Sequence, residues 1–142
     1  MNPYVELKNK HQKEINDFPF GFAFSKSQFD DMMINKFGLT PEDTDKICRI
    51  GGGCYIRKAD EKALDEMFKR HSQERRAAME EDPCGYCYHM FDYELANHEY
   101  NYTRDVTDAL DALGLTYEEV KANKGMHDIL MKAIKHQESL DW

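Results

Sequence analysis

Three consecutive glycines, Gly51-Gly52-Gly53, lie between two β-prone runs at residues 46–50 and 54–58. Glycine adopts the left-handed backbone conformations that a tight turn needs, and the flanking runs are rich in β-branched and aromatic side chains. We therefore expect a β-hairpin here. Because most of the remaining chain repeats its apolar residues at helical spacing, this hairpin restricts the fold to helices combined with a small antiparallel sheet.

Helical periodicity accounts for most of the chain outside the hairpin. Capping residues, prolines and glycines mark where the helices begin and end, as at Pro83 and Gly114. The expected helices cover residues 3–17, 25–37, 60–81, 86–99, 104–113 and 125–140, with short helical turns after residues 40 and 116. We expect an α+β fold, mostly α, with about five to six helices packed around the short hairpin. Residues 22–24 are expected to form one further strand or an extended core segment.

The length and composition indicate one folded domain over residues 1–142. An apolar share of 41% is ordinary for a folded protein, and 142 residues can bury a sizeable core. No run approaches the roughly 20 apolar residues that span a bilayer. The first residues lack the basic start and apolar run of a secretion signal, so we expect a cytoplasmic protein without a membrane partner.

The formal charge of −8 is spread unevenly along the chain. Residues 80–120 contain 11 acidic side chains and a single basic one, Arg104, so that this segment alone has a charge of −10. Such a segment repels nucleic-acid phosphates and attracts a basic protein surface. The charge pattern therefore argues against direct binding of DNA or RNA.

The acidic segment is also rich in tyrosine, a residue that is enriched in the cores of protein interfaces. Two interpretations are open: a solvated acidic surface, or a protein-binding face, including one that imitates the charge of a nucleic acid. On the second interpretation the expected partner-binding residues are Tyr88, Asp92, Tyr93, Glu99, Tyr100, Tyr102, Asp105 and Asp108.

Glu94 and His98 form an unusual polar pair on an apolar helical stripe. They are one helical turn apart, close enough to touch. A half-buried carboxylate beside an imidazole suits a metal site or a general base, with Asp105 or Asp108 as a third group. The same pair also fits a satisfied structural hydrogen bond. Both interpretations stay open at this point.

The four cysteines suggest a second metal hypothesis. Cys84 and Cys87 have the spacing of zinc ligands, and Cys48 and Cys54 of the hairpin could complete the set. The wide spacing between Cys48 and Cys54 weakens this zinc hypothesis, and small buried or inert thiols are the alternative.

The chain lacks the motifs that define common enzymes. No lysine follows the three glycines as in a phosphate-binding loop, and residue 102, where a zinc protease motif needs a histidine, is Tyr102. We therefore expect a binding protein more than an enzyme. Its oligomeric state is not predicted.

The chain resembles a family of short uncharacterised proteins of Firmicutes and their phages. The motifs that carry the resemblance are Phe22-Ala23-Phe24, Asp43-Thr44-Asp45-Lys46-Ile47, Ile50-Gly51-Gly52-Gly53, Ile56-Arg57-Lys58, Glu66-Met67-Phe68-Lys69-Arg70-His71, Glu94-Leu95-Ala96-Asn97-His98-Glu99-Tyr100, Asp108-Ala109-Leu110-Asp111-Ala112-Leu113-Gly114-Leu115-Thr116 and Thr116-Tyr117-Glu118-Glu119-Val120. The family has no function to transfer, and its pattern does not include the four cysteines.

A mobile-element origin implies a class of roles, because small acidic phage proteins often act by binding host machinery. The resemblance therefore favours a protein that binds a basic host surface, including a host-defence inhibitor of the anti-CRISPR kind. The alternative function is a small metal-dependent enzyme or metal-binding protein that uses Glu94 and His98.

Overall fold

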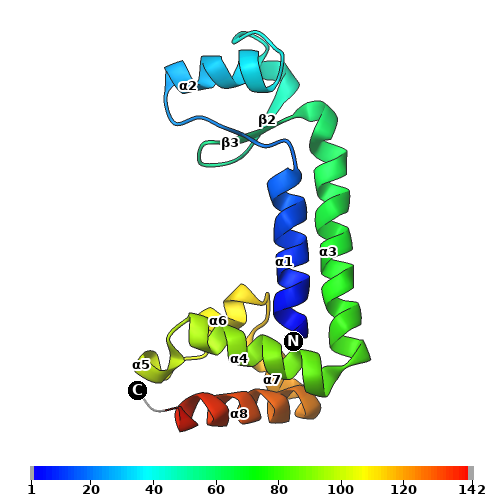
Figure 1. The fold of residues 1–142 in the computed structure, drawn as a ribbon, viewed down its shortest axis with the longest axis vertical. Helices are drawn as coiled ribbons and strands as arrows, with labels where there is room; N and C mark the ends of the chain where they lie inside the picture. Colours follow the sequence, from blue (N-terminus) through cyan, green and yellow to red (C-terminus); the bar gives the residue numbers. More distant parts are fainter. Residues whose placement is uncertain (1, 141–142) are drawn as a thin grey trace. The chain divides into compact units, whose positions relative to one another are not determined.

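Eight α-helices and a three-stranded antiparallel sheet form the part of the chain that the computed structural model describes, residues 2–140 (Figure 1). The helices are α1 (Pro3–Asp17), α2 (Lys26–Asp31), α3 (Glu61–Glu81), α4 (Tyr88–Asn97), α5 (Tyr100–Thr103), α6 (Thr107–Ala112), α7 (Tyr117–Ala122) and α8 (Lys124–Ser139), and the strands are β1 (Gly21–Phe22), β2 (Ile47–Gly51) and β3 (Cys54–Arg57). The expected class, α+β and mostly α, is confirmed.

The residue contacts divide the chain into two compact units. Unit 1 comprises Met1–His11 and Gln73–Trp142, and unit 2 comprises Gln12–Ser72. Helices α1 and α3 are each divided between the two units, so that one part of each helix belongs to unit 1 and the other part to unit 2. Whether residues 1–142 behave as the single domain expected from their length stays a prediction.

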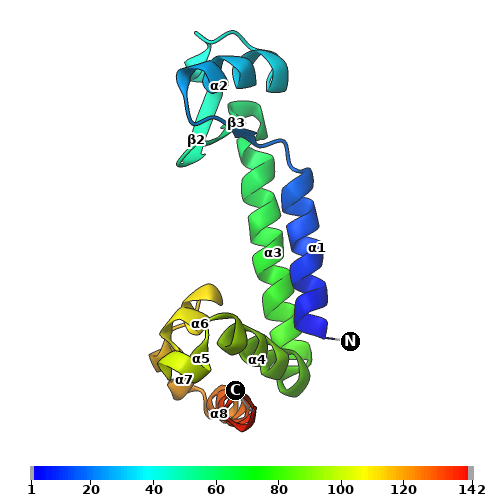
Figure 2. The same cartoon turned by 60° about the vertical axis from the view of Figure 1, so that its left-hand side comes forward.

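The sheet of unit 2 is the predicted hairpin with one added strand. β2 and β3 pair antiparallel, with Cys48 opposite Ile56, and β1 joins the other edge of β3 (Figure 2). At the turn Gly53 has a φ of +75°, and the ring of Phe24 occupies the space that a Cβ atom would need there. Glycine is therefore required at position 53 for two separate reasons.

Unit 2 has two small apolar clusters. Met32, Met33 and Phe37 are buried around Ala23 at the end of α2, where the helix continues as a single π-helical turn, Met32–Lys36. Ile56 of β3 packs with residues of α3 in the second cluster. The expected helix at residues 25–37 is thus an α-helix followed by a π turn.

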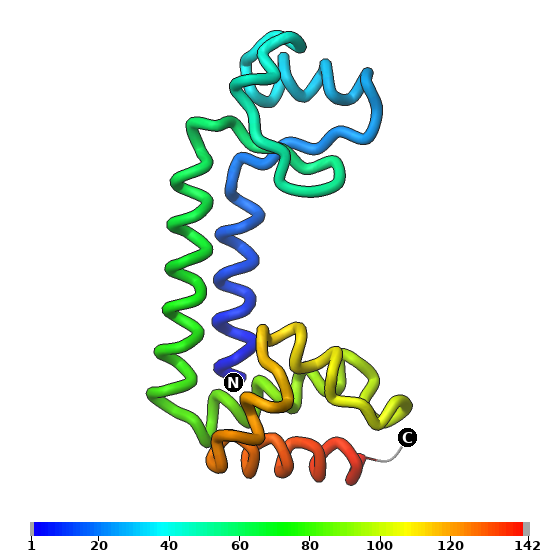
Figure 3. The backbone as a smooth tube through the Cα atoms, turned by 180° about the vertical axis from the view of Figure 1, so that it is seen from behind, coloured from blue at the N-terminus to red at the C-terminus, as the bar shows by residue number. Residues whose placement is uncertain are grey.

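Unit 1 is built around the packing of α4 against α8, which lie side by side in Figures 1 and 3. Phe91 and Leu95 of α4 and Leu130 of α8 are each 1% exposed or less. Leu110 of α6 and Val120 of α7 are buried in the same cluster. This core uses the apolar stripe that the sequence predicts for residues 125–140.

The structure has more helices than expected because the backbone breaks where the apolar pattern continues. The expected helix at 86–99 is a π turn at Pro83–Cys87 followed by α4, and the one at 104–113 shortens to α6. Glu99 and Arg104 have left-handed backbones, with φ of 56° and 55°, and they bracket the extra helix α5.

The sequence predicts that Phe68 of α3 faces the core, but its side chain is 44% exposed. Among the described residues, no helix has the length and apolar content to cross a bilayer.

Candidate functional site

Glu94 is a buried carboxylate in the core of unit 1, with 1% of its surface exposed. Its α4 neighbours Phe91 and Leu95 face the same core, so the helix carries Glu94 inward. The Tyr4 hydroxyl donates a hydrogen bond to Oε1 over 3.1 Å, and the Lys8 ammonium lies 3.0 Å from the same oxygen. His98 Nε2 lies 3.4 Å from Oε2, as a spacing of one helical turn predicts.

The surroundings of Glu94 supply its carboxylate with a fixed set of hydrogen-bond donors. Burial, followed by the neighbouring Glu94 charge, raises the pKa of Tyr4 well above its usual range, so its hydroxyl stays protonated and keeps donating. The Lys8 ammonium also lies 5.0 Å from the ring centroid of Tyr93, within the range of a cation–π interaction. Lys8 thus holds a positive charge beside the carboxylate.

These contacts agree with the structural interpretation of the Glu94–His98 pair. A buried carboxylate needs hydrogen bonds and a counter-charge, and Tyr4 and Lys8 supply both. Among residues 2–140, no three His, Cys, Asp or Glu side chains gather as a metal site, so Asp105 and Asp108 do not join the pair. The metal alternative therefore lacks a third ligand within the described chain.

The cysteines likewise form no group of metal ligands within the described residues. Cys84 is exposed and Cys87 is buried in unit 1, while Cys48 and Cys54 of unit 2 are half-buried, and all four are free thiols. Burial, and to a lesser degree Asp82, raises the pKa of Cys87 to about 11. A buried thiol with a raised pKa is less reactive than an exposed one, which agrees with the alternative of small buried thiols.

The tyrosines of the acidic segment divide into exposed and buried rings. Tyr102 is 71% exposed and Tyr93 is 36% exposed, whereas Tyr88 is half-buried against the ring of His136. Tyr100 is buried, and its hydroxyl donates to Glu138 over 3.3 Å. Tyr93 and Tyr102 can therefore offer ring surface to a partner, whereas the ring of Tyr100 packs in the core of unit 1.

The acids of the segment also differ in what they bind. Asp92 is half-buried and accepts a hydrogen bond from Gln137 Nε2 over 2.8 Å. Asp105 accepts hydrogen bonds from the Thr107 hydroxyl over 2.6 Å and from the Thr107 backbone N–H over 2.9 Å, and the hydroxyl, followed by the N–H, lowers the pKa of Asp105. Glu99 and Asp108 are exposed and, within residues 2–140, have no basic side chain within 4 Å.

Most of the negative charge of the chain belongs to unit 1. Its sequence contains 16 acidic and 9 basic side chains, whereas unit 2 contains 11 acidic and 10 basic ones. Unit 1 thus has a net charge of −7 and unit 2 of −1. Four exposed acids of unit 1 lie in or next to α5 to α7 and have no basic side chain within 4 Å among residues 2–140, namely Glu99, Asp108, Asp111 and Glu118.

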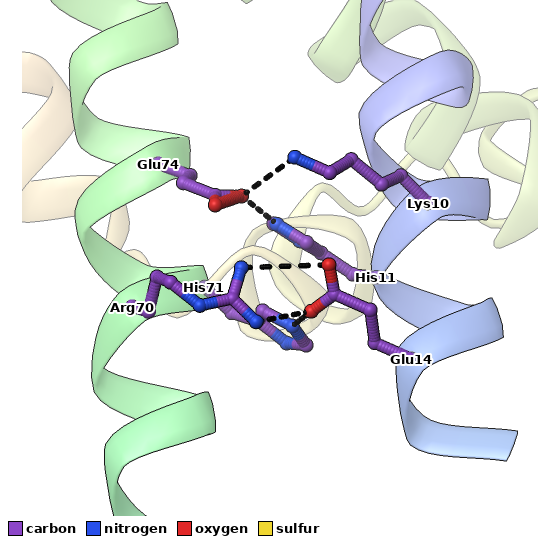
Figure 4. A network of polar contacts seen from close by, with 6 residues as sticks. All are labelled: Lys10, His11, Glu14, Arg70, His71 and Glu74. Carbon is purple, nitrogen blue, oxygen red and sulfur yellow. Dashed lines mark hydrogen bonds and ion pairs between the residues drawn. The ribbon is translucent and has the colours of Figure 1, made fainter. Parts of the chain in front are cut away.

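Two buried histidines that the sequence interpretation did not single out bind carboxylates where α1 lies beside α3 (Figure 4). In unit 1, His11 Nε2 lies 2.7 Å from Glu74 Oε2, and in unit 2, His71 Nε2 contacts Glu14 Oε2. His11 is 5% exposed and His71 is 1% exposed. The sequence does contain a signal for them, because each helix places a histidine three residues before a glutamate, in helical register.

Acid should weaken unit 2 through Glu14. Hydrogen bonds from Arg70, and then from His71, lower the pKa of Glu14 from 4.5 to about 2. Since the folded pKa lies below the unfolded one, this stabilisation is present above pH 4.5 and is lost as the pH falls toward 2. Unfolding by urea at about pH 6 and about pH 3 should therefore show a smaller loss of stability in Glu14→Gln than in the wild type. Equal losses in the two proteins would rule out this contribution.

A family model matches residues 3–136 of the chain, and its description is a family of unknown function, DUF7659. The match covers nearly the whole chain. This protein belongs to the DUF7659 family. No curated protein and no solved structure matches the chain significantly.

The DUF7659 match runs through both units and includes every candidate residue described above, from Tyr4 to Asp108. The description of DUF7659 assigns these residues no role. The charges, exposures and contacts of the side chains are therefore the basis for a functional proposal.

Proposed function

We propose that this chain is a protein-binding protein whose acidic segment in unit 1 docks onto a basic surface of a host protein. The observation that carries the proposal is the set of exposed carboxylates from α5 to α7 that lack basic partners within the described chain. The net negative charge of unit 1 attracts a basic partner and steers the encounter.

The exposed rings of Tyr93 and Tyr102 supply the apolar contact that charge alone does not give. Tyrosine contributes a large rigid surface with a polar end, and such anchors dominate the energy of many interfaces. The docking surface that we propose comprises Tyr88, Asp92, Tyr93, Glu99, Tyr102, Asp105 and Asp108. Tyr100 is left out because its ring is buried.

The chemistry of the partner follows from the charge of the surface. Carboxylates spaced along a segment can take the place of phosphates, so the favoured partner is a protein whose basic surface normally holds a nucleic acid. Together with the resemblance to proteins of Firmicutes phages, this points to an inhibitor of host defence, of the anti-CRISPR kind, acting in the cytoplasm. The chain itself would not bind DNA or RNA.

Charge reversal should separate docking from a merely solvated surface. The triple variant Glu99→Lys, Asp108→Lys and Asp111→Lys changes exposed residues of unit 1 and should retain a host partner at least about tenfold less well than the wild type. The measurement is the amount of each protein that the immobilised chain recovers from host lysate at low salt, with identification by mass spectrometry.

A matched variant in unit 2 controls for the change in total charge. Asp17→Lys, Glu42→Lys and Asp45→Lys also reverse three exposed acids and should retain the partner as the wild type does. Circular dichroism of both variants checks their folding. If the two triple variants retained every recovered protein equally, the docking proposal would be wrong.

A further inference from the structure

Unit 2 contains a groove of about 1090 Å³ beside β1. Its volume is slightly larger than the roughly 300–1,000 Å³ typical of ligand pockets. The apolar part of the lining comes from the end of α1, the segment around β1, the start of the π turn and α3. These lining residues are Ile15, Phe18, Phe20, Phe22, Met32 and Phe68, and Ile50 of β2 adds one more.

The phenylalanines give the groove an aromatic floor. The ring centroids of Phe18 and Phe20 lie 5.0 Å apart, and those of Phe20 and Phe22 lie 6.5 Å apart. Phe22 is 60% exposed and Phe68 is 44% exposed, so two large apolar side chains of the lining face solvent. Clustered exposed rings of this kind mark a binding site more often than a scattered single apolar residue does.

The polar side chains of the lining have hydrogen-bond donors left over. The side-chain oxygen of Gln28 accepts from the Phe24 N–H over 2.8 Å, and that of Asn16 accepts from Gln12 Nε2 over 2.9 Å. Among the described residues, no acceptor lies within hydrogen-bond reach of the amide NH₂ groups of Gln28 and Asn16. A ligand that fits this lining brings acceptors.

The lining contains one positive and one negative side chain. Lys36 and Asp31 are its charged residues. Among residues 2–140, Lys36 has no acidic side chain within 4 Å and Asp31 has no basic one, although Asp31 accepts a hydrogen bond from Asn35 Nδ2 over 2.6 Å. Lys36 thus keeps a full charge and three donors available to a bound molecule.

We propose that this groove binds an amphipathic carboxylate, a molecule with an apolar chain or aryl body and one carboxylate head. The body lies on the Phe20, Phe22 and Phe68 rings, and the head accepts hydrogen bonds from Lys36. A carboxylate is the head group that matches this set because it only accepts hydrogen bonds and bears a negative charge. The proposal uses unit 2 alone and stands independently of the acidic segment.

Calorimetric titration of the full chain with three probes of equal chain length tests this proposal. Dodecanoate, dodecanol and dodecylammonium, each below its micellar concentration, share one apolar body and differ in the head. Dodecanoate should bind at least about tenfold more tightly than the other two, because only its head pairs with Lys36. Equal binding of all three probes, or binding of none, would overturn the proposal.

Single substitutions locate the site of binding. Lys36→Gln should weaken dodecanoate binding about tenfold and leave dodecanol binding unchanged, whereas Phe22→Ala should weaken both. Lys62→Gln is the matched control, since Lys62 is exposed on α3 outside the lining, and it should bind dodecanoate as the wild type does. If Lys62→Gln and Lys36→Gln had equal effects, the head group would not lie at Lys36. Circular dichroism confirms that each variant is folded.

Discussion

Phe91→Ala should lower the free energy of unfolding by about 3–5 kcal/mol, the largest effect that we expect from a single substitution. Phe91 is 1% exposed and lies in the cluster that joins α4 to α8. Truncation removes most of a buried ring and leaves a cavity, because the surrounding residues relax only in part. Unfolding in urea, followed by circular dichroism at 222 nm, a wavelength sensitive to helix content, measures the loss.

A control on the same pair of helices separates burial from a general effect of truncation. Met131 of α8 is 46% exposed, and Met131→Ala should lower the free energy of unfolding by less than about 1 kcal/mol. If the two substitutions had similar effects, Phe91 would not lie in the core and the packing of α4 on α8 would be wrong.

Glu94→Ala should lower the free energy of unfolding by about 2–4 kcal/mol. The substitution leaves the buried Tyr4 hydroxyl without its acceptor and Lys8 without its counter-charge. Lys8 is 44% exposed and can turn to water, which keeps the cost below that of a fully buried ion pair. Tyr4→Phe removes one donor and should cost about 1 kcal/mol.

The sign of the Glu94→Ala effect distinguishes the two interpretations of the Glu94–His98 pair. A structural carboxylate stabilises the fold, and a double-mutant cycle with Tyr4→Phe should show coupling of at least about 0.5 kcal/mol. A carboxylate kept for chemistry is often held at a cost in stability. Unchanged or increased stability of Glu94→Ala would therefore contradict the structural interpretation.

The sequence predicts those elements whose cause is local. The three glycines specify the hairpin because the turn needs a left-handed backbone, as Gly53 has, and the stripe of α8 follows from helical periodicity. The end of α4 is different. Glu99 adopts a left-handed backbone that its side chain does not favour, so tertiary contacts decide where the helix stops.

The candidate site shows the same division. The contact between Glu94 and His98 is predictable, because residues four apart on a helix touch. The contacts of Glu94 with Tyr4 and Lys8 are not predictable, since they join residues that are 90 and 86 positions apart in the chain. The exposure of Phe68 also depends on packing, because its position in the helical period predicts burial.

The central claim is that unit 1 docks through its carboxylates, and the salt dependence of binding tests it most directly. The affinity of the purified chain for a recovered basic partner is measured across a salt series, for the wild type and for the triple variant with Glu99→Lys, Asp108→Lys and Asp111→Lys. Screening weakens exposed ion pairs, so the affinity of the wild type should fall steeply with salt and that of the variant should be low throughout. An affinity that stays constant across the series, or that the variant shares with the wild type, would contradict the account.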